Sequence, residues 1–174
     1  MKIHSESRIP HAQAKVYGAY RDRLPEVAAY IPDIKSIAVV SQEDVAHGRK
    51  LHNRWTADRE IPKMVQRFLK PEMLCWDDYA DWHDAEAYCD WRLSIPAFPT
   101  QVQCSGRNTF VADGAHTRVV LTGELHIQAS KIPGVPKLLA RQLAPQIEKF
   151  IVRLITPNLE QVNRSLGAFL DDNG

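Results

Sequence analysis

Residues 101–128 read QVQCSGRNTFVADGAHTRVVLTGELHIQ, with an Asp113-Gly114 pair between two segments in which apolar and polar residues alternate. Such a pair favours a tight β-hairpin, because its backbone readily adopts the positive φ angles that the turn requires. The apolar positions of the second segment are Val119, Leu121, Leu125 and Ile127. The alternation predicts two antiparallel strands, over 101–112 and 117–128, with one face buried and the other in water.

The N-terminal side of this hairpin shows the same alternation. It predicts strands over 1–9, 37–41, 49–56, 73–82 and 86–95. Short turns at 46–48 and 83–85 join four of these strands in pairs, which implies antiparallel neighbours. After the first strand, apolar residues at helical spacing predict two short helices, over 12–21 and 24–31. The sheet region therefore contains about seven strands, most of them joined by tight turns.

The C-terminal part of the chain has the periodicity of a helix. Between Lys137 and Leu170, apolar residues recur every three or four positions: Leu139, Leu143, Ile147, Phe150, Leu154, Val162, Leu166 and Phe169. This spacing predicts a long amphipathic helix. Pro145 and Pro157 each remove a backbone donor, so we expect two or three helical pieces lying along a curved sheet.

Together these elements predict one α+β domain over residues 1–174, in which a curved antiparallel sheet of about seven strands grips the C-terminal helix and encloses an apolar pocket. This element order, with the opening MKIHSESRIP at residues 1–10, resembles the START-like, or Bet v 1-like, helix-grip (SRPBCC) superfamily of lipid-transfer proteins, polyketide cyclases and aromatases. A more distant resemblance, to PRELI/MSF1 phospholipid-transfer domains, rests on 48–51, 53–55, 61–65, 98–102 and 117–121.

The charge of the chain is balanced, with 22 Lys and Arg against 21 Asp and Glu and a formal net charge of +1. No global field draws the protein toward nucleic acid, so we expect no nucleic-acid partner. The N-terminus lacks the apolar core of a signal peptide, and no segment is long and apolar enough to span a bilayer. A cytoplasmic location is expected, and the oligomeric state stays open.

Motifs for metals and cofactors are missing from the sequence. The seven histidines show no ligand spacing, and no phosphate loop, dinucleotide fingerprint or nucleophile elbow occurs. We therefore expect no metal ion and no cofactor. Cys75, Cys89 and Cys104 contain no Cys-x-x-Cys pair, and we expect them to be buried thiols.

The expected pocket follows from the alternation. It should be lined by Asn53, Trp55, Trp91, Leu93, Asn108, Phe110, Leu121 and Leu125 of the strands and by Phe150, Ile151 and Leu154 of the helix. We expect a cavity of about 300–1,000 Å³, whereas Trp82 should lie near a strand end. Buried amides need partners, so Asn53 and Asn108 should bind each other, water or a ligand head group, unless they bond neighbouring backbone or lie at the open rim.

Two charged segments have both a functional and an ordinary interpretation. The segment 61–70 contains a basic amphipathic set: Lys63, Met64, Arg67 and Phe68. It could form a lid or a weak membrane contact, or it could be an ordinary packed surface helix with a solvated basic face. The carboxylates Asp77, Asp78 and Asp81 are expected to form a solvated strand face rather than an acid–base pair.

The function that these patterns favour is binding or transfer of a small hydrophobic or amphipathic, lipid-like ligand in the internal pocket. One alternative is an enzyme of the polyketide cyclase or aromatase type, in which Asn108 with Arg107 or Tyr79 would polarise a carbonyl. A second alternative is a protein-interaction module without a ligand. The pocket residues are of general apolar types, and they do not identify a ligand.

Overall fold

The strands and helices follow the predicted order in a computed structural model that describes residues 1–174 apart from 64–65, 67–69, 71–73, 129–130 and 132–136. The elements are β1 (Lys2–Ile9), α1 (Gln13–Asp22), α2 (Leu24–Val27), the 3-10 helix η1 (Ala28–Tyr30), β2 (Ile34–Val45), β3 (Gly48–Ala57), β4 (Cys75–His83), β5 (Tyr88–Ser94), β6 (Val102–Asp113), β7 (His116–Ile127) and α3 (Lys137–Asn173). The predicted α+β class and the two short helices after the first strand are therefore confirmed.

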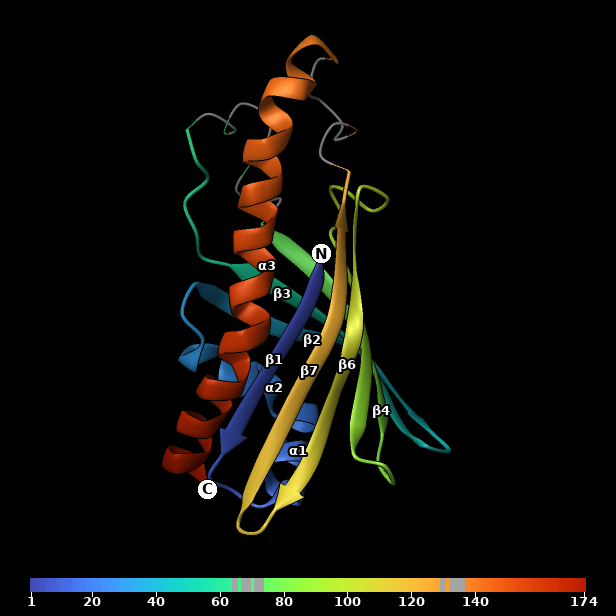
Figure 1. The fold of residues 1–174 in the computed structure, drawn as a ribbon. Coiled ribbons are helices and arrows are strands. Elements are labelled where there is room, and N and C mark those ends of the chain that lie inside the picture. The colour runs from blue at the N-terminus through green and yellow to red at the C-terminus, as the bar shows by residue number, and fades with distance from the viewer. Residues whose placement is uncertain (64–65, 67–69, 71–73, 129–130, 132–136) are drawn as a thin grey trace.

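The seven strands form one antiparallel sheet in the order β1-β7-β6-β5-β4-β3-β2. Every neighbouring pair from β2 to β7 is consecutive in the chain, and β1 pairs with β7. Figure 1 shows the sheet curving around α3, with α1 and α2 beside the C-terminal part of that helix. The hairpin at Asp113-Gly114 joins β6 to β7 as predicted, and Asp113 pairs with His116.

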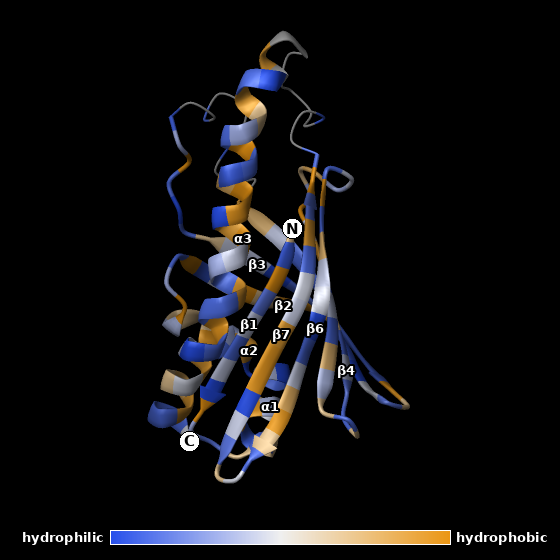
Figure 2. Cartoon of the chain, in the orientation of Figure 1, coloured by the Kyte–Doolittle hydropathy of each residue, from blue (hydrophilic) through white to orange (hydrophobic). Residues whose placement is uncertain are grey.

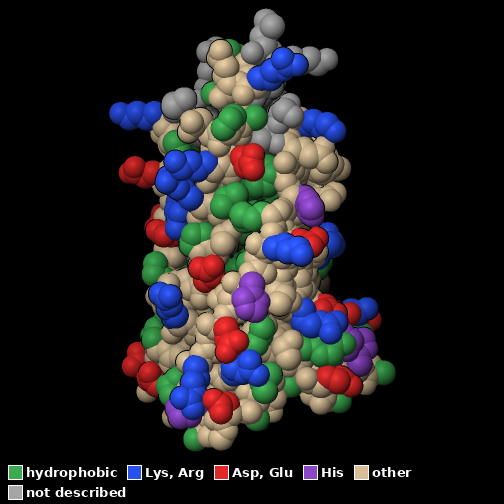
Figure 3. All heavy atoms as spheres, in the orientation of Figure 1, with side chains coloured by type: hydrophobic (Ala, Val, Ile, Leu, Met, Phe, Trp, Pro, Cys, Tyr) green, Lys and Arg blue, Asp and Glu red, His purple; other side chains and the backbone are tan. Residues whose placement is uncertain are grey.

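The faces of the strands follow the predicted alternation. On β7, Val119, Leu121 and Leu125 are buried, whereas Arg118 and His126 are exposed. Figure 2 shows this alternation as bands of opposite hydropathy along the strands. On the face seen in Figure 3, Lys and Arg side chains are interspersed with Asp and Glu, in keeping with the balanced charge of the chain.

The expectation that the C-terminal helix is broken is wrong, because α3 is one helix of 37 residues with Pro145 and Pro157 inside it. Each internal proline costs about 3 kcal/mol. On both sides of Pro157 the helix buries apolar side chains completely or nearly so: Ile147, Ile151, Leu154, Ile155, Val162, Leu166 and Phe169. Each such side chain contributes about 1.5–3 kcal/mol, so packing against the sheet outweighs the cost of the prolines.

In the middle of the sheet, the indole ring of Trp91 lies very close to the backbone of β6 and β7. Gly106 of β6 pairs with Trp91 on one side and with Gly123 of β7 on the other. A Cβ atom on Gly106 would lie 2.5 Å from Cζ2 of Trp91, and one on Gly123 would lie 2.9 Å from Cη2 of the same ring. Two glycines therefore make the room in which the Trp91 side chain lies flat on its neighbouring strands.

Gly106→Ala should lower the free energy of unfolding by about 1–3 kcal/mol, because the added methyl group collides with the indole and with the backbone. The matched control is Gly18→Ala in α1, where an added Cβ meets nothing within 4 Å. That change should raise stability by about 0.5–1 kcal/mol, since alanine favours a helix over glycine. Urea denaturation of the three proteins measures both effects, and equal stabilities for the two variants would contradict the close packing.

Candidate functional site

A pocket lies between the sheet and α3, where residues of β3 to β6 face Ile155, Leu159 and Val162 of the helix. About 540 Å³ of space lies between the lining atoms and the open mouth, but only about 40 Å³ of it admits the centre of a water-sized molecule. The expected cavity of about 300–1,000 Å³ is therefore wrong in size. Large side chains occupy the space that the alternation left open.

Those large side chains are chiefly indole rings, because all four tryptophans of the chain line the pocket: Trp55, Trp76, Trp82 and Trp91. Trp55 and Trp76 are paired across β3 and β4, and their rings stack with centroids 5.7 Å apart. Trp82 lies next to the end of β4, as expected, yet its side chain lines the pocket, is 2% exposed and packs against Tyr17, Tyr20 and Phe110. The pocket is thus walled by aromatic rings.

A carboxyl group lies among these rings. Asp78 of β4 is 8% exposed, lines the pocket and accepts a hydrogen bond from Nδ2 of Asn53 at 3.4 Å. Burial raises the pKa of Asp78 to about 6, against smaller lowering effects of Asn53, Trp55 and the charge of His52. Because this pKa is close to neutral, the carboxyl can take up or release a proton near physiological pH.

The expectation of a solvated acidic face is wrong for Asp77 and Asp78, which are both buried. Asp78 alternates in phase with Trp76, Ala80 and Trp82, so the pleat of β4 turns it inward. Asp77 points to the other face, where Arg54 donates to it at 2.9 and 3.0 Å. His52 also contacts Asp77, at 2.8 Å, and only Asp81 of the three carboxylates is substantially exposed.

A second polar group inside the pocket is centred on Asn108. Its Oδ1 accepts from Nε1 of Trp91 at 3.1 Å, and its Nδ2 donates to the hydroxyl of Tyr20 at 3.2 Å. Burial raises the pKa of Tyr20, so the phenol stays protonated at neutral pH. Asn53 and Asn108 therefore do not bind each other, and each is held by side chains rather than by neighbouring backbone.

Some hydrogen-bonding capacity of the pocket is unused. Among the described residues, Oδ1 of Asn53 and Nε1 of both Trp55 and Trp82 are buried without a hydrogen-bond partner. Trp55 still lies near enough to Asp78 to lower the pKa of the carboxyl. A buried polar atom without a partner costs about 1–3 kcal/mol. A ligand with a donor and an acceptor group would satisfy these atoms.

The predicted site residues fall into two groups. Asn53, Trp55, Trp91, Leu93 and Asn108 line the pocket. The others lie outside its lining: Phe110 in the aromatic cluster, Leu121 and Leu125 on β7, Ile151 and Leu154 in the core face of α3, and Phe150 at a separate hollow beside Arg59 and Lys149. A role of these residues in ligand binding stays a prediction.

Sequence reasoning missed other lining residues, among them Tyr20, Asp78, Ile155 and Asn158. The available signal was the alternation of Asp78 with tryptophans in β4. The enzyme alternative named Arg107 and Tyr79, but both lie on the outer face: Arg107 forms an ion pair with Asp90 at 2.6 Å, and Tyr79 stacks on His52. Of that set, only Asn108 faces the pocket.

The segment 61–70 is only partly described. Ile61 is buried, Lys63 is exposed in a turn, and Nε2 of Gln66 donates to the carbonyl of Ile61 at 2.7 Å. Met64, Arg67 and Phe68 lie outside the described residues. None of the described helices is both long and apolar enough to cross a membrane.

Burial of Asp78 has a consequence for stability that depends on pH. At low pH the carboxyl is protonated in both states; as pH rises, the unfolded chain releases the proton at its ordinary pKa of 3.8, before the folded protein does at about 6. Wild-type stability should therefore fall between about pH 4 and pH 6, by up to about 3 kcal/mol from this group.

Asp78→Asn should remove that loss, so the stability of the variant relative to wild type should rise between about pH 4 and about pH 7. Urea denaturation of both proteins at the two pH values measures this difference, in which the contributions of the other carboxylates cancel. Identical pH dependence of the two proteins would show that Asp78 is not a buried acid with a raised pKa.

The chain matches no protein-family model and no curated protein, but it is similar to solved structures. TTHA0849 from Thermus thermophilus has a TM-score of 0.70 at 20% identity, covering 100% of this chain and 99% of that one. The Zhui aromatase/cyclase from Streptomyces sp. R1128 has 0.65 at 16%, covering 100% and 98%. A START superfamily protein from Mycobacterium smegmatis has 0.50 at 13%, covering 89% and 94%. The chain thus has the helix-grip fold that these solved structures share.

Proposed function

We propose that this protein binds a small amphipathic molecule with a flat apolar part in the pocket between the sheet and α3. The observation that carries the proposal is the composition of the lining, in which four indole rings surround Asp78 and the unpartnered polar atoms of Asn53 and Trp55. Aromatic walls bind flat apolar groups, and a few inward polar groups orient them. The similarity to an aromatase/cyclase in fold supports a pocket at this place.

Ligand entry requires the pocket to widen. The space that now admits a water-sized centre, about 40 Å³, is far below the usual range of about 300–1,000 Å³ for ligand sites. Leu159 of α3 is half-buried and belongs to the lining, so it can move without breaking the sheet. We infer that ligand displaces side chains on the helix side, where no strand hydrogen bonds are lost.

A second candidate function is catalysis of the cyclase or aromatase type, and Asp78 is the observation that favours it. A general acid or base works best when its pKa is near the working pH, and burial brings the pKa of Asp78 to about 6. The carboxyl could protonate a carbonyl oxygen of the substrate, and the carboxylate could accept a proton from the carbon atom next to that carbonyl group. The neutral Tyr20–Asn108 pair could orient the same substrate through hydrogen bonds.

The variant Asp78→Asn distinguishes the two candidate functions, ligand binding and catalysis. If the protein only binds its ligand, the variant should hold a fluorescent fatty acid or a fused-ring aromatic probe within about threefold of wild type. If it is an enzyme, ring closure of a poly-β-ketone substrate should fall by about 10²–10⁴-fold in the variant while binding persists. Lipid transfer between membranes, and weak membrane contact by segment 61–70, stay predictions.

Leu159→Trp should fill the widening side of the pocket and weaken binding of the fluorescent fatty acid by at least tenfold. The matched control is Leu139→Trp on the same helix, where the side chain is 40% exposed and is not part of the lining. Titration followed by the emission of the bound probe measures both affinities. Equal affinities for the two variants would place the ligand elsewhere.

Native mass spectrometry of protein purified from its own host provides the independent test. A co-purifying small molecule that is lost in Leu159→Trp and retained in Leu139→Trp would support the proposal and give the mass of the ligand. If the protein carries no molecule and binds neither the fatty acid nor the fused-ring probe, the proposal of ligand binding is wrong. That result would favour a ligand-free interaction module.

A further inference from the structure

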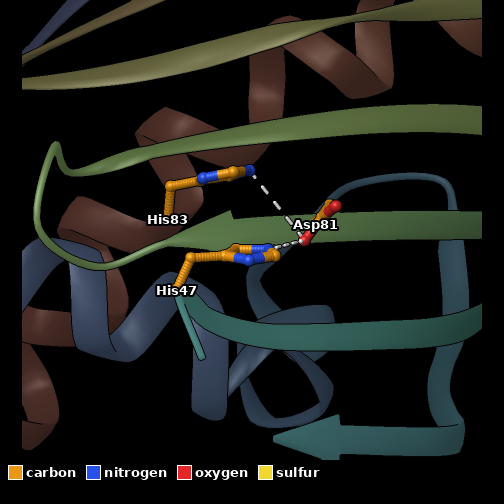
Figure 4. Close-up of side chains that lie close together, drawn as sticks. All are labelled: His47, Asp81 and His83. Atoms are coloured by element: carbon orange, nitrogen blue, oxygen red, sulfur yellow. Dashed lines mark hydrogen bonds and ion pairs between the residues drawn. The ribbon is translucent and has the colours of Figure 1, made fainter. Parts of the chain in front are cut away.

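Two histidines and a carboxylate meet at the end of the sheet where β3 begins and β4 ends, away from the tryptophan pocket. His47 lies in the turn between β2 and β3, His83 ends β4, and Asp81 precedes it on the same face of that strand. The pairing of Gly48 with His83 brings the two histidines together although they are far apart in the sequence. Figure 4 shows both imidazoles directed toward the carboxylate of Asp81.

The three side chains converge through their polar atoms. Nε2 of His47 lies 2.8 Å from Oδ1 of Asp81, and Nε2 of His83 lies 4.0 Å from the same oxygen. One ligand atom from each residue lies within 4.8 Å of the other two. The side chains of His47, Asp81 and His83 are 40%, 37% and 21% exposed, so an ion in solution can reach them.

The ion pair of His47 with Asp81 accounts for only part of this arrangement, because Nε2 of His83 lies 4.0 Å from the same carboxylate oxygen, beyond hydrogen-bonding distance. The rings of His47 and His83 stack with centroids 4.2 Å apart and planes 19° apart. A metal cation between the three groups satisfies both nitrogens and the oxygen.

We propose that His47, Asp81 and His83 bind a divalent transition-metal ion such as Zn²⁺. Two imidazole nitrogens and one carboxylate are a common ligand set for zinc, and they leave a fourth position for water. Tetrahedral ligands at about 2.0–2.1 Å from zinc lie about 3.3 Å apart. To reach that value the partly exposed His47 ring has to turn out of its stack on His83, so that the lone pairs of both Nε2 atoms point to one ion beside Asp81.

Neighbouring aromatic groups hold His83 in place. Tyr88 stacks on His83 with centroids 4.3 Å apart, and His47 stacks on the same ring. The guanidinium of Arg107 lies 3.9 Å from the centre of the Tyr88 ring, and Asp90 fixes Arg107 through an ion pair at 2.6 Å. The contact with Tyr88 holds His83 beside Asp81, so that His47 is the ligand that has to move, and an ordered ligand loses less entropy when an ion binds.

Zinc titration of the chelator-treated full chain tests the proposal by competition with a chromogenic chelator. Wild type should bind one equivalent of Zn²⁺, and His47→Ala and His83→Gln should each weaken that binding by at least tenfold. The matched control is His52→Ala, because His52 also contacts an aspartate at 2.8 Å and stacks on a tyrosine but lies outside the three-residue cluster. Its affinity should equal that of wild type.

Thermal unfolding gives a second readout that does not depend on the competitor. Saturating Zn²⁺ should raise the Tm of wild type and of His52→Ala, and should leave the Tm of His47→Ala and His83→Gln unchanged, because an ion that binds only the folded state stabilises it. Absence of stoichiometric binding to wild type, or undiminished binding to both His47→Ala and His83→Gln, would overturn the proposal. Neither outcome bears on the interior pocket.

Discussion

The packing of one apolar helix face into the concave side of the sheet is the contact on which the rest of this structure depends. Ile147, Ile151 and Leu166 of α3 are almost fully buried there, and this burial is large enough to keep two prolines inside a continuous helix. Where the helix passes β3 to β6, the facing side chains do not close completely. The pocket is the space that these side chains leave unfilled. The strands beside it also place polar groups among the tryptophans.

Much of the fold could be predicted because it depends on local patterns. Alternation identified the strands, and Asp113-Gly114 identified the turn between β6 and β7. The site depended on something else, namely which residue lies opposite which across the sheet. Asn53 meets Asp78 and Gly48 meets His83 only through the register of β3 with β4, which no single strand displays. The continuity of α3 through Pro145 and Pro157 could not be predicted for a similar reason, because the low helix propensity of proline is local whereas the burial that offsets it depends on contacts with the sheet.

The polar groups of the pocket are costly to keep. Asp78 stands among four indoles with one weak hydrogen bond, and the oxygen of Asn53 beside it has no partner. An apolar residue of similar volume at position 78 would avoid the desolvation of a carboxyl. By contrast, the outward carboxylate of the same strand, Asp77, is satisfied by Arg54 and His52. Three of the seven buried side-chain polar atoms that have no partner among the described residues belong to the pocket lining, where a ligand would reach them.

The location of every tryptophan in one cavity also gives the protein a built-in optical reporter. All indole emission of this chain originates from Trp55, Trp76, Trp82 and Trp91, which are all buried and share the same lining. The emission of the native protein should therefore have the short wavelength of a dry environment. Any compound, solvent change or substitution that wets this one cavity will be visible as a red shift, without a label attached to the chain.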